Sequence, residues 1–164
     1  MEVLISGDLY LPKNYKDELN FTKDLIELFN SADFRIANLE APITKATPSN
    51  KILKTSPHLE TLPEVIFPLV KKLKIHLATL ANNHIMNYGY EGLNDTIDHL
   101  KKSKIDYVGA GFNLKEASKT YIIEKENLTV AVVNISENEW ASADNNSPGA
   151  HPVNLVDNYK KIRE

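Results

Sequence analysis

One short apolar segment that runs directly into polar side chains constrains this chain more than any other feature. Residues 75–80 are mostly apolar, and Asn82, Asn83 and His84 follow almost at once. From residue 89 onward, apolar residues recur at helical spacing: Leu93, Ile97 and Leu100. A strand followed by a helix is the repeating unit of a parallel α/β sheet. Ligands of such sheets bind beyond the carboxyl ends of the strands, where these polar side chains would stand.

Two earlier apolar segments end in acidic residues. The first segment of the chain leads into Asp8, and a later one leads into Glu40. Because parallel strands end at the same edge, we expect both carboxylates to meet Asn83 and His84 there. Carboxylate, amide and imidazole groups together suit a divalent ion such as manganese, iron, zinc or magnesium. Without a cation, two neighbouring carboxylates repel each other and one tends to hold its proton.

The rest of the chain continues the alternation and predicts an α/β fold. Strands are predicted at 1–6, 34–38, 75–80 and 105–108, helices at 21–29, 59–73, 89–103, 114–117 and 153–163, and a hairpin at 121–124 with 129–135. Pro68 is expected to kink or restart its helix. Residues 41–57 are rich in Thr, Ser, Lys and Pro and predict a long loop. Long loops in compact domains are more often functional than idle, so we expect this loop to overhang the site.

Composition excludes several functions. The 164 residues, 42% of them hydrophobic, are enough for one domain with a sizeable core. A net charge of -3 gives no basic surface for nucleic acid. The absence of cysteine excludes disulfides, thiolate metal sites and cysteine nucleophiles. No apolar run approaches the ~20 residues of a membrane span, so the sequence as given predicts a cytoplasmic protein.

A series of motifs follows along the chain: GDLY, NLEAPIT, LANNHIMNYGYEGLNDTIDHL, IDYVGAGFNLKEA and ISENEW, then SPGAHPVNLVDNYKKI. In this order they resemble the motifs of the bacterial capsule-synthesis CapA family, the poly-γ-glutamate capsule proteins, a branch of the calcineurin-like metallophosphoesterases. The resemblance extends from residue 3 to about residue 160. It implies a layered α/β sandwich of the metallophosphatase type.

The resemblance also implies a role for each polar residue at the strand ends. Asp8 matches an aspartate that binds one metal ion, Glu40 an acidic residue that bridges or holds the metals, and Asn83 the amide ligand of the second metal. His84 matches the histidine that donates a proton to the leaving group. Two divalent ions would lower the pKa of a shared water and neutralise charge on the reacting centre. Further residues expected to line the site are Asn38, Asn82, Asn87, Glu137 and Glu139.

The chain departs from the family pattern in two ways. Asn87 stands where the family commonly has an aspartate that would orient His84. The family also continues beyond the position of Glu164 into histidine-bearing segments, which supply most nitrogen ligands. We therefore expect residues 1–164 to be a single CapA-like domain truncated at its C-terminus, with the first half to two-thirds of the fold. The truncation would come from a fragment, a split gene or proteolysis; the alternative is a natural truncation stabilised by self-association.

Two functions follow from the resemblance. The first is a metal-dependent hydrolase or phosphoesterase of capsular polysaccharide or poly-γ-glutamate biosynthesis or export, with a polyanionic polymer or phosphoester as substrate. It would be inactive until the missing C-terminal segment or self-association completed the site. The alternative is a non-catalytic polymer-binding or assembly module. The family often carries an N-terminal membrane anchor, and removal of one would make the location membrane-associated or extracytoplasmic.

Two other features have structural interpretations. The segment Gly109-Ala110-Gly111 lacks the third glycine and the full helix of a dinucleotide site, so we interpret it as a tight turn. The four other histidines lack metal-ligand spacing and are expected to be structural: His58, His76, His99 and His151.

Overall fold

A parallel sheet of four strands forms the centre of the molecule. The computed structural model describes residues 1–163. The strands are β1 (Val3–Leu9), β2 (Phe34–Leu39), β3 (Leu77–Thr79) and β4 (Asp106–Val108), in that spatial order. Every neighbouring pair is parallel, which confirms the α/β class expected from the sequence.

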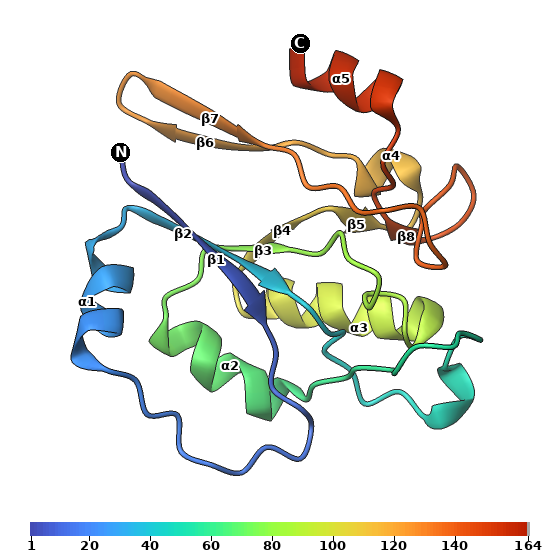
Figure 1. Ribbon diagram of the computed structural model, residues 1–164, viewed down its shortest axis with the longest axis horizontal. Helices are drawn as coiled ribbons and strands as arrows, with labels where there is room; N and C mark the ends of the chain where they lie inside the picture. The colour runs from blue at the N-terminus through green and yellow to red at the C-terminus, as the bar shows by residue number, and fades with distance from the viewer. Residues whose placement is uncertain (164) are drawn as a thin grey trace.

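Helices cover one face of this sheet. They are α1 (Lys23–Ser31), α2 (Pro63–Lys72) and α3 (Gly89–Lys102), and they lie together beneath the sheet in Figure 1. Their apolar sides and that face of the sheet form the larger core, with Leu93 and Ile97 of α3 almost completely buried. The loop between β2 and α2 contains a short 3-10 turn, η1 (Pro48–Asn50).

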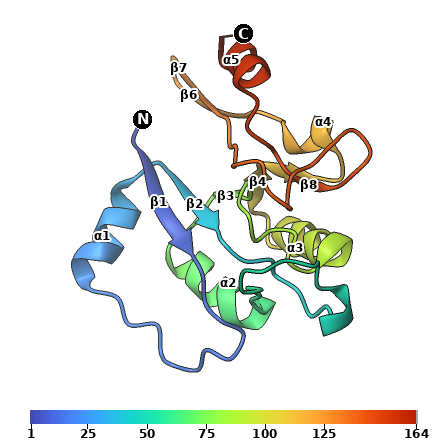
Figure 2. The same ribbon diagram turned by 45° about the vertical axis from the view of Figure 1, so that its right-hand side comes forward.

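The opposite face of the sheet is covered by the C-terminal part of the chain (Figure 2). The hairpin of β6 (Tyr121–Lys125) and β7 (Leu128–Val132) packs on a smaller core that contains Ile36 and Leu77. The remaining elements are β5 (Ala110–Gly111), α4 (Leu114–Ala117), β8 (Gly149–Ala150) and α5 (Leu155–Arg163), with β5 and β8 antiparallel.

The first strand is longer than the sequence predicts. Ile5 pairs with Ile36 and Asp8 pairs with Asn38, so β1 holds one extra residue between the two pairs. Such a bulge bends an edge strand and redirects its side chains. Asp8 therefore lies inside β1 and not beyond its end.

The prediction for α2 needs correction. α2 begins at Pro63, four residues later than predicted, because a proline at the first helical position needs no N–H partner. Pro68 lies inside α2 without restarting it. The apolar residues of α5 are largely exposed: Val156 is 61%, Tyr159 60% and Ile162 65% exposed. Among residues 1–163, no helix has both the length and the apolar character that a membrane crossing requires.

Candidate functional site

Asn38 holds two carboxylates together at the carboxyl edge of the sheet. Its Nδ2 donates to Asp8 Oδ1 at 2.7 Å and to Glu40 Oε2 at 2.9 Å. Its Oδ1 accepts from Thr79 Oγ1 at 3.3 Å and from Asn82 Nδ2 at 3.4 Å. The donors on the oxygen side fix the orientation of the amide. Sheet register explains the meeting, because Asp8, Asn38 and Thr79 are paired across three neighbouring strands.

The carboxyl group of Glu40 has a raised pKa. Burial raises its pKa, and the charge of Asp8 raises it further. The amide of Asn38 and the ammonium of Lys54 act in the opposite direction. A like charge nearby disfavours the ionised form, whereas a cation would relieve the repulsion. The pair therefore has the electrostatic character of a cation-binding position.

Asn82 shapes the loop that follows β3. Its Oδ1 accepts from the backbone N–H groups of His84 and Ile85, both at 3.0 Å, and its Nδ2 donates to the Leu39 carbonyl at 2.9 Å. Asn side chains often close turns in this way. Asn87 N–H then donates to the His84 carbonyl at 2.9 Å. The amide of Asn82 is thus used to position His84.

His84 faces the carboxylates from this loop. Its Nε2 is 3.6 Å from Glu40 Oε1. Its Nδ1 lies 3.0 Å from Asn87 Nδ2 and 3.4 Å from Lys54 Nζ. Burial lowers the pKa of His84 below the ordinary imidazole value, and the charge of Lys54 lowers it further. The environment therefore favours the neutral imidazole.

Lys54 is a site residue that the sequence analysis missed. It extends from the loop at 41–57, which packs on the site loop through a hydrogen bond from Ile52 N–H to the Asn87 carbonyl at 3.2 Å. Lys54 Nζ lies 5.6 Å from the centre of the Trp140 ring. Burial lowers its pKa, while Glu139 and then Glu40 raise it. The length of the loop was the only sequence signal, and the loop does overhang the site.

Asn83 lies toward a neighbouring pocket. This pocket is lined by Asn82, Asn83, Ser136, Glu137 and Glu139. The Asn83 carbonyl accepts from Trp140 Nε1 at 3.1 Å, which ties the two loops together. Within residues 1–163, Glu139 Oε2 is buried and has no hydrogen-bond partner. The structure thus brings Asp8, Glu40 and His84 together through Asn38, and places Asn83 with Glu137 and Glu139.

The donors present match part of a metal site. Asp8 and Glu40 supply hard oxygen ligands around one amide, and the unpartnered oxygen of Glu139 is a further acceptor that a cation would satisfy. In the described part of the chain, however, no group of three or more His, Asp or Glu side chains is arranged to hold a metal ion. The chemistry of the donors fits a divalent ion, and their number does not make a closed site.

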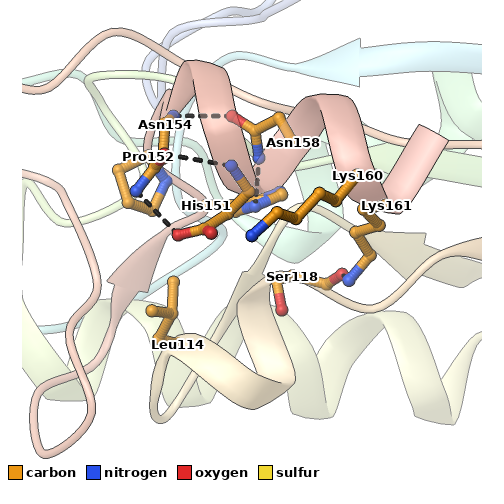
Figure 3. Close-up of a pocket in the computed structure, with 9 residues that line it drawn as sticks. Leu114, Ser118, His151, Pro152, Asn154, Asn158, Lys160 and Lys161 are labelled. Carbon is orange, nitrogen blue, oxygen red and sulfur yellow. Dashed lines mark hydrogen bonds between the residues drawn. The ribbon is translucent and has the colours of Figure 1, made fainter. Parts of the chain in front are cut away.

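A different pocket lies between α4 and α5 (Figure 3). His151 lines it and is only 4% exposed. Its Nδ1 is 3.0 Å from the Asn134 carbonyl oxygen, and its Nε2 is 3.0 Å from Asn158 Nδ2. One ring nitrogen contacts the segment after β7 and the other contacts α5, in keeping with the structural role expected for His151.

Comparison with known protein families identifies the family of this chain. The model for the family described as "Bacterial capsule synthesis protein PGA_cap" matches residues 3–162. The chain belongs to this family. The match confirms the resemblance found in the motifs and covers both the carboxylate pair and the His84 loop.

Comparison with individual proteins gives several relatives that are named for capsule or polymer synthesis. The "PGA biosynthesis protein CapA" of Bacillus subtilis is 31% identical over 129 residues, which are 77% of this chain and 33% of the relative. The "Capsule biosynthesis protein CapA" of Bacillus anthracis is 27% identical over 157 residues, 90% of this chain and 38% of the relative. A "Probable polyglutamine synthesis accessory protein" of Mycobacterium tuberculosis is 31% identical over 120 residues, which are 73% of this chain and 30% of the relative. The chain spans about a third of the length of these relatives.

Proposed function

We propose that this chain carries part of the active site of a metal-dependent hydrolase that acts in poly-γ-glutamate or capsular polysaccharide biosynthesis or export. One observation carries the proposal: Asn38 joins the carboxylates of Asp8 and Glu40, and His84 Nε2 lies 3.6 Å from Glu40. The printed names of the Bacillus relatives support the biological process.

Asp8, Glu40 and Asn83 are the proposed ligands for divalent ions, two of them in the complete site. Manganese, iron, zinc and magnesium all accept such oxygen donors. A bound ion would neutralise charge on a phosphoryl or acyl centre and lower the pKa of a water. Further ligands would come from outside the described residues, either from additional chain or from a second copy.

The chain's own side chains have separate tasks in this proposal. Asn38 keeps the two carboxylates adjacent, and Asn82 holds the loop that carries His84. The Nε2 side of His84 faces the site and would donate a hydrogen bond that stabilises charge on the leaving-group oxygen. Lys54 brings a positive charge beside His84, which suits a phosphoester or a polyanionic polymer.

A non-catalytic module that binds the polymer or an assembly partner is the second candidate. It is favoured by the lack, within residues 1–163, of a group of three or more His, Asp or Glu side chains placed for a metal ion. Binding to a polyanion would then depend on Lys54 and not on Asp8 or Glu40.

The test is a rate assay on the polypeptide as its gene encodes it, with Mn²⁺, on an aryl phosphate ester and on γ-linked glutamate oligomers. Asn83→Ala should lower the metal-dependent rate, and His84→Ala should lower it by ~10²–10³-fold, as removal of one hydrogen-bond donor to a developing negative charge does. Asn138→Ala is the matched control, because its side chain donates to the Val153 carbonyl. Metal-independent polymer binding that survives both site substitutions would favour the binding module.

A further inference from the structure

The orientation of the Asn87 side chain can be read from its neighbours. Asn87 is 0% exposed, and its Nδ2 lies 3.2 Å from the Leu59 carbonyl oxygen and 3.0 Å from His84 Nδ1. A carbonyl oxygen only accepts hydrogen bonds, so the atom facing Leu59 must be the amide nitrogen. Turning the amide over would place its oxygen against that carbonyl. One N–H therefore points at Leu59, and the other points at His84.

Two donors converge on the same nitrogen of His84. Besides the Asn87 amide, Lys54 Nζ lies 3.4 Å from His84 Nδ1, and an ammonium group can only donate. Nδ1 must then offer its lone pair. In a neutral imidazole the proton is in consequence on Nε2, which is the nitrogen that faces Glu40.

We propose that Asn87 is a positioning residue that fixes His84 in the Nε2–H tautomer, so that the ring presents a hydrogen-bond donor to the site and is not a metal ligand. The catalytic meaning of this assignment rests on the proposed function, whereas the tautomer itself follows from the hydrogen bonds. A neutral imidazole in this state donates to an anionic or leaving-group oxygen through Nε2.

The unpartnered oxygen of Asn87 supports a functional reason for its amide. In the described part of the chain, Asn87 Oδ1 is buried and has no hydrogen-bond partner. A buried polar atom without a partner destabilises the fold, and an apolar side chain of similar size would avoid that cost. The two N–H donations explain why an amide occupies this position.

The tautomer can be measured by long-range ¹H–¹⁵N correlation NMR on protein labelled at histidine nitrogens. At pH 8, above the ordinary imidazole pKa of about 6.5, the rings are neutral. The five histidines give separate patterns, and His84 is identified by the signal lost in His84→Gln. We expect a protonated Nε2 and an unprotonated Nδ1.

Asn87→Asp is the decisive variant. A carboxylate can only accept, so it should draw the proton to Nδ1 and leave Nε2 with a lone pair. His151 is an internal control of opposite tautomer, because its Nδ1 must donate to the Asn134 carbonyl. An unchanged His151 pattern shows that the variant has folded. Asn87→Leu removes the amide and leaves Lys54 as the remaining donor to His84 Nδ1, so the fraction of the Nε2–H tautomer should fall below that of the parent. This variant still tests the proposal if the aspartate variant unfolds.

The proposal is overturned if His84 carries its proton on Nδ1 in the parent protein, or if Asn87→Asp and Asn87→Leu both leave the His84 pattern unchanged. Neither measurement uses metal or substrate, so its result is independent of the hydrolase proposal. The expected tautomers without hydrolysis would refute the hydrolase alone.

Discussion

Gly109→Ala should disturb the loop that leads into the candidate site, although Gly109 is not itself a site residue. Gly109 has a φ of +97°, a region that side chains with a Cβ rarely adopt. A Cβ placed there would lie 2.7 Å from Asn134 Cγ and 2.8 Å from Ala81 N. Asn134 Oδ1 accepts the Ala81 N–H at 2.6 Å, directly before Asn82. The added methyl group must therefore strain the backbone or push Asn134 off that N–H.

The expected loss of stability follows from two contributions. A residue forced into an unfavourable backbone region costs about 1–3 kcal/mol. Loss of the hydrogen bond to a buried N–H costs about 1–3 kcal/mol more. A total of about 2–6 kcal/mol is a large part of the roughly 5–15 kcal/mol that holds a typical domain together. For a chain of this size it lowers Tm by roughly 4–24 °C.

Urea and thermal unfolding followed by circular dichroism would measure this loss. Gly7→Ala is the matched control, because nothing lies within 4 Å of a Cβ at Gly7, and its stability should stay within about 0.5 kcal/mol of the parent. In an Asn134→Ala background, Gly109→Ala should cost less, since the same hydrogen bond is already lost. Equal stabilities of Gly109→Ala and Gly7→Ala would refute the reasoning.

Three further predictions concern stability. Asn82→Ala should lower the unfolding free energy by about 2–4 kcal/mol, because the Leu39 carbonyl and the N–H groups of His84 and Ile85 lose their hydrogen-bond partner. Asn83→Ala should change it by at most about 0.5 kcal/mol in the same urea titration. Burial and the charge of Asp8 raise the pKa of Glu40, so ionisation of Glu40 destabilises the fold as the pH rises above about 4.3. Glu40→Gln should therefore be more stable than the parent at pH 7 and as stable as the parent near pH 4. Equal stabilities at both pH values would contradict this prediction. Burial lowers the pKa of His151, so the unfolded chain binds more protons in weak acid; stability should fall as the pH drops below about 6.5, and His151→Gln should fall less steeply, with chemical unfolding at pH 7 and pH 5 as the measurement.

Periodicity and strand order explain what the sequence reveals about the fold. The spacing of Leu93, Ile97 and Leu100 predicts the buried side of α3, and all three are at most 1% exposed. Alternation of strands and helices predicts parallel pairing, because each crossover returns the chain to the same edge. For this reason Asp8 and Glu40 lie near each other at the carboxyl edge of the sheet.

Side-chain partners are what the sequence does not reveal. Lys54 reaches His84 across thirty positions, and no local pattern marks that contact. The direction of the Asn38 amide depends on Thr79, on a different strand. The bulge in β1 depends on pairing with β2 and on no signal within the strand. Spacing in α5 indicates an apolar side, although Tyr159 is left 60% exposed.

The most direct test of the metal site is a calorimetric titration of Mn²⁺ into residues 1–164, compared with the double variant Asp8→Asn, Glu40→Gln. We expect weak binding to the parent chain, because two carboxylates supply only part of a coordination shell, and its loss in the double variant. Glu27→Gln, on the exposed surface of α1, should bind as the parent does. Mn²⁺ binding that is unchanged in the double variant would contradict the assignment of Asp8 and Glu40, and tight one-to-one binding by the parent chain would contradict the partial site.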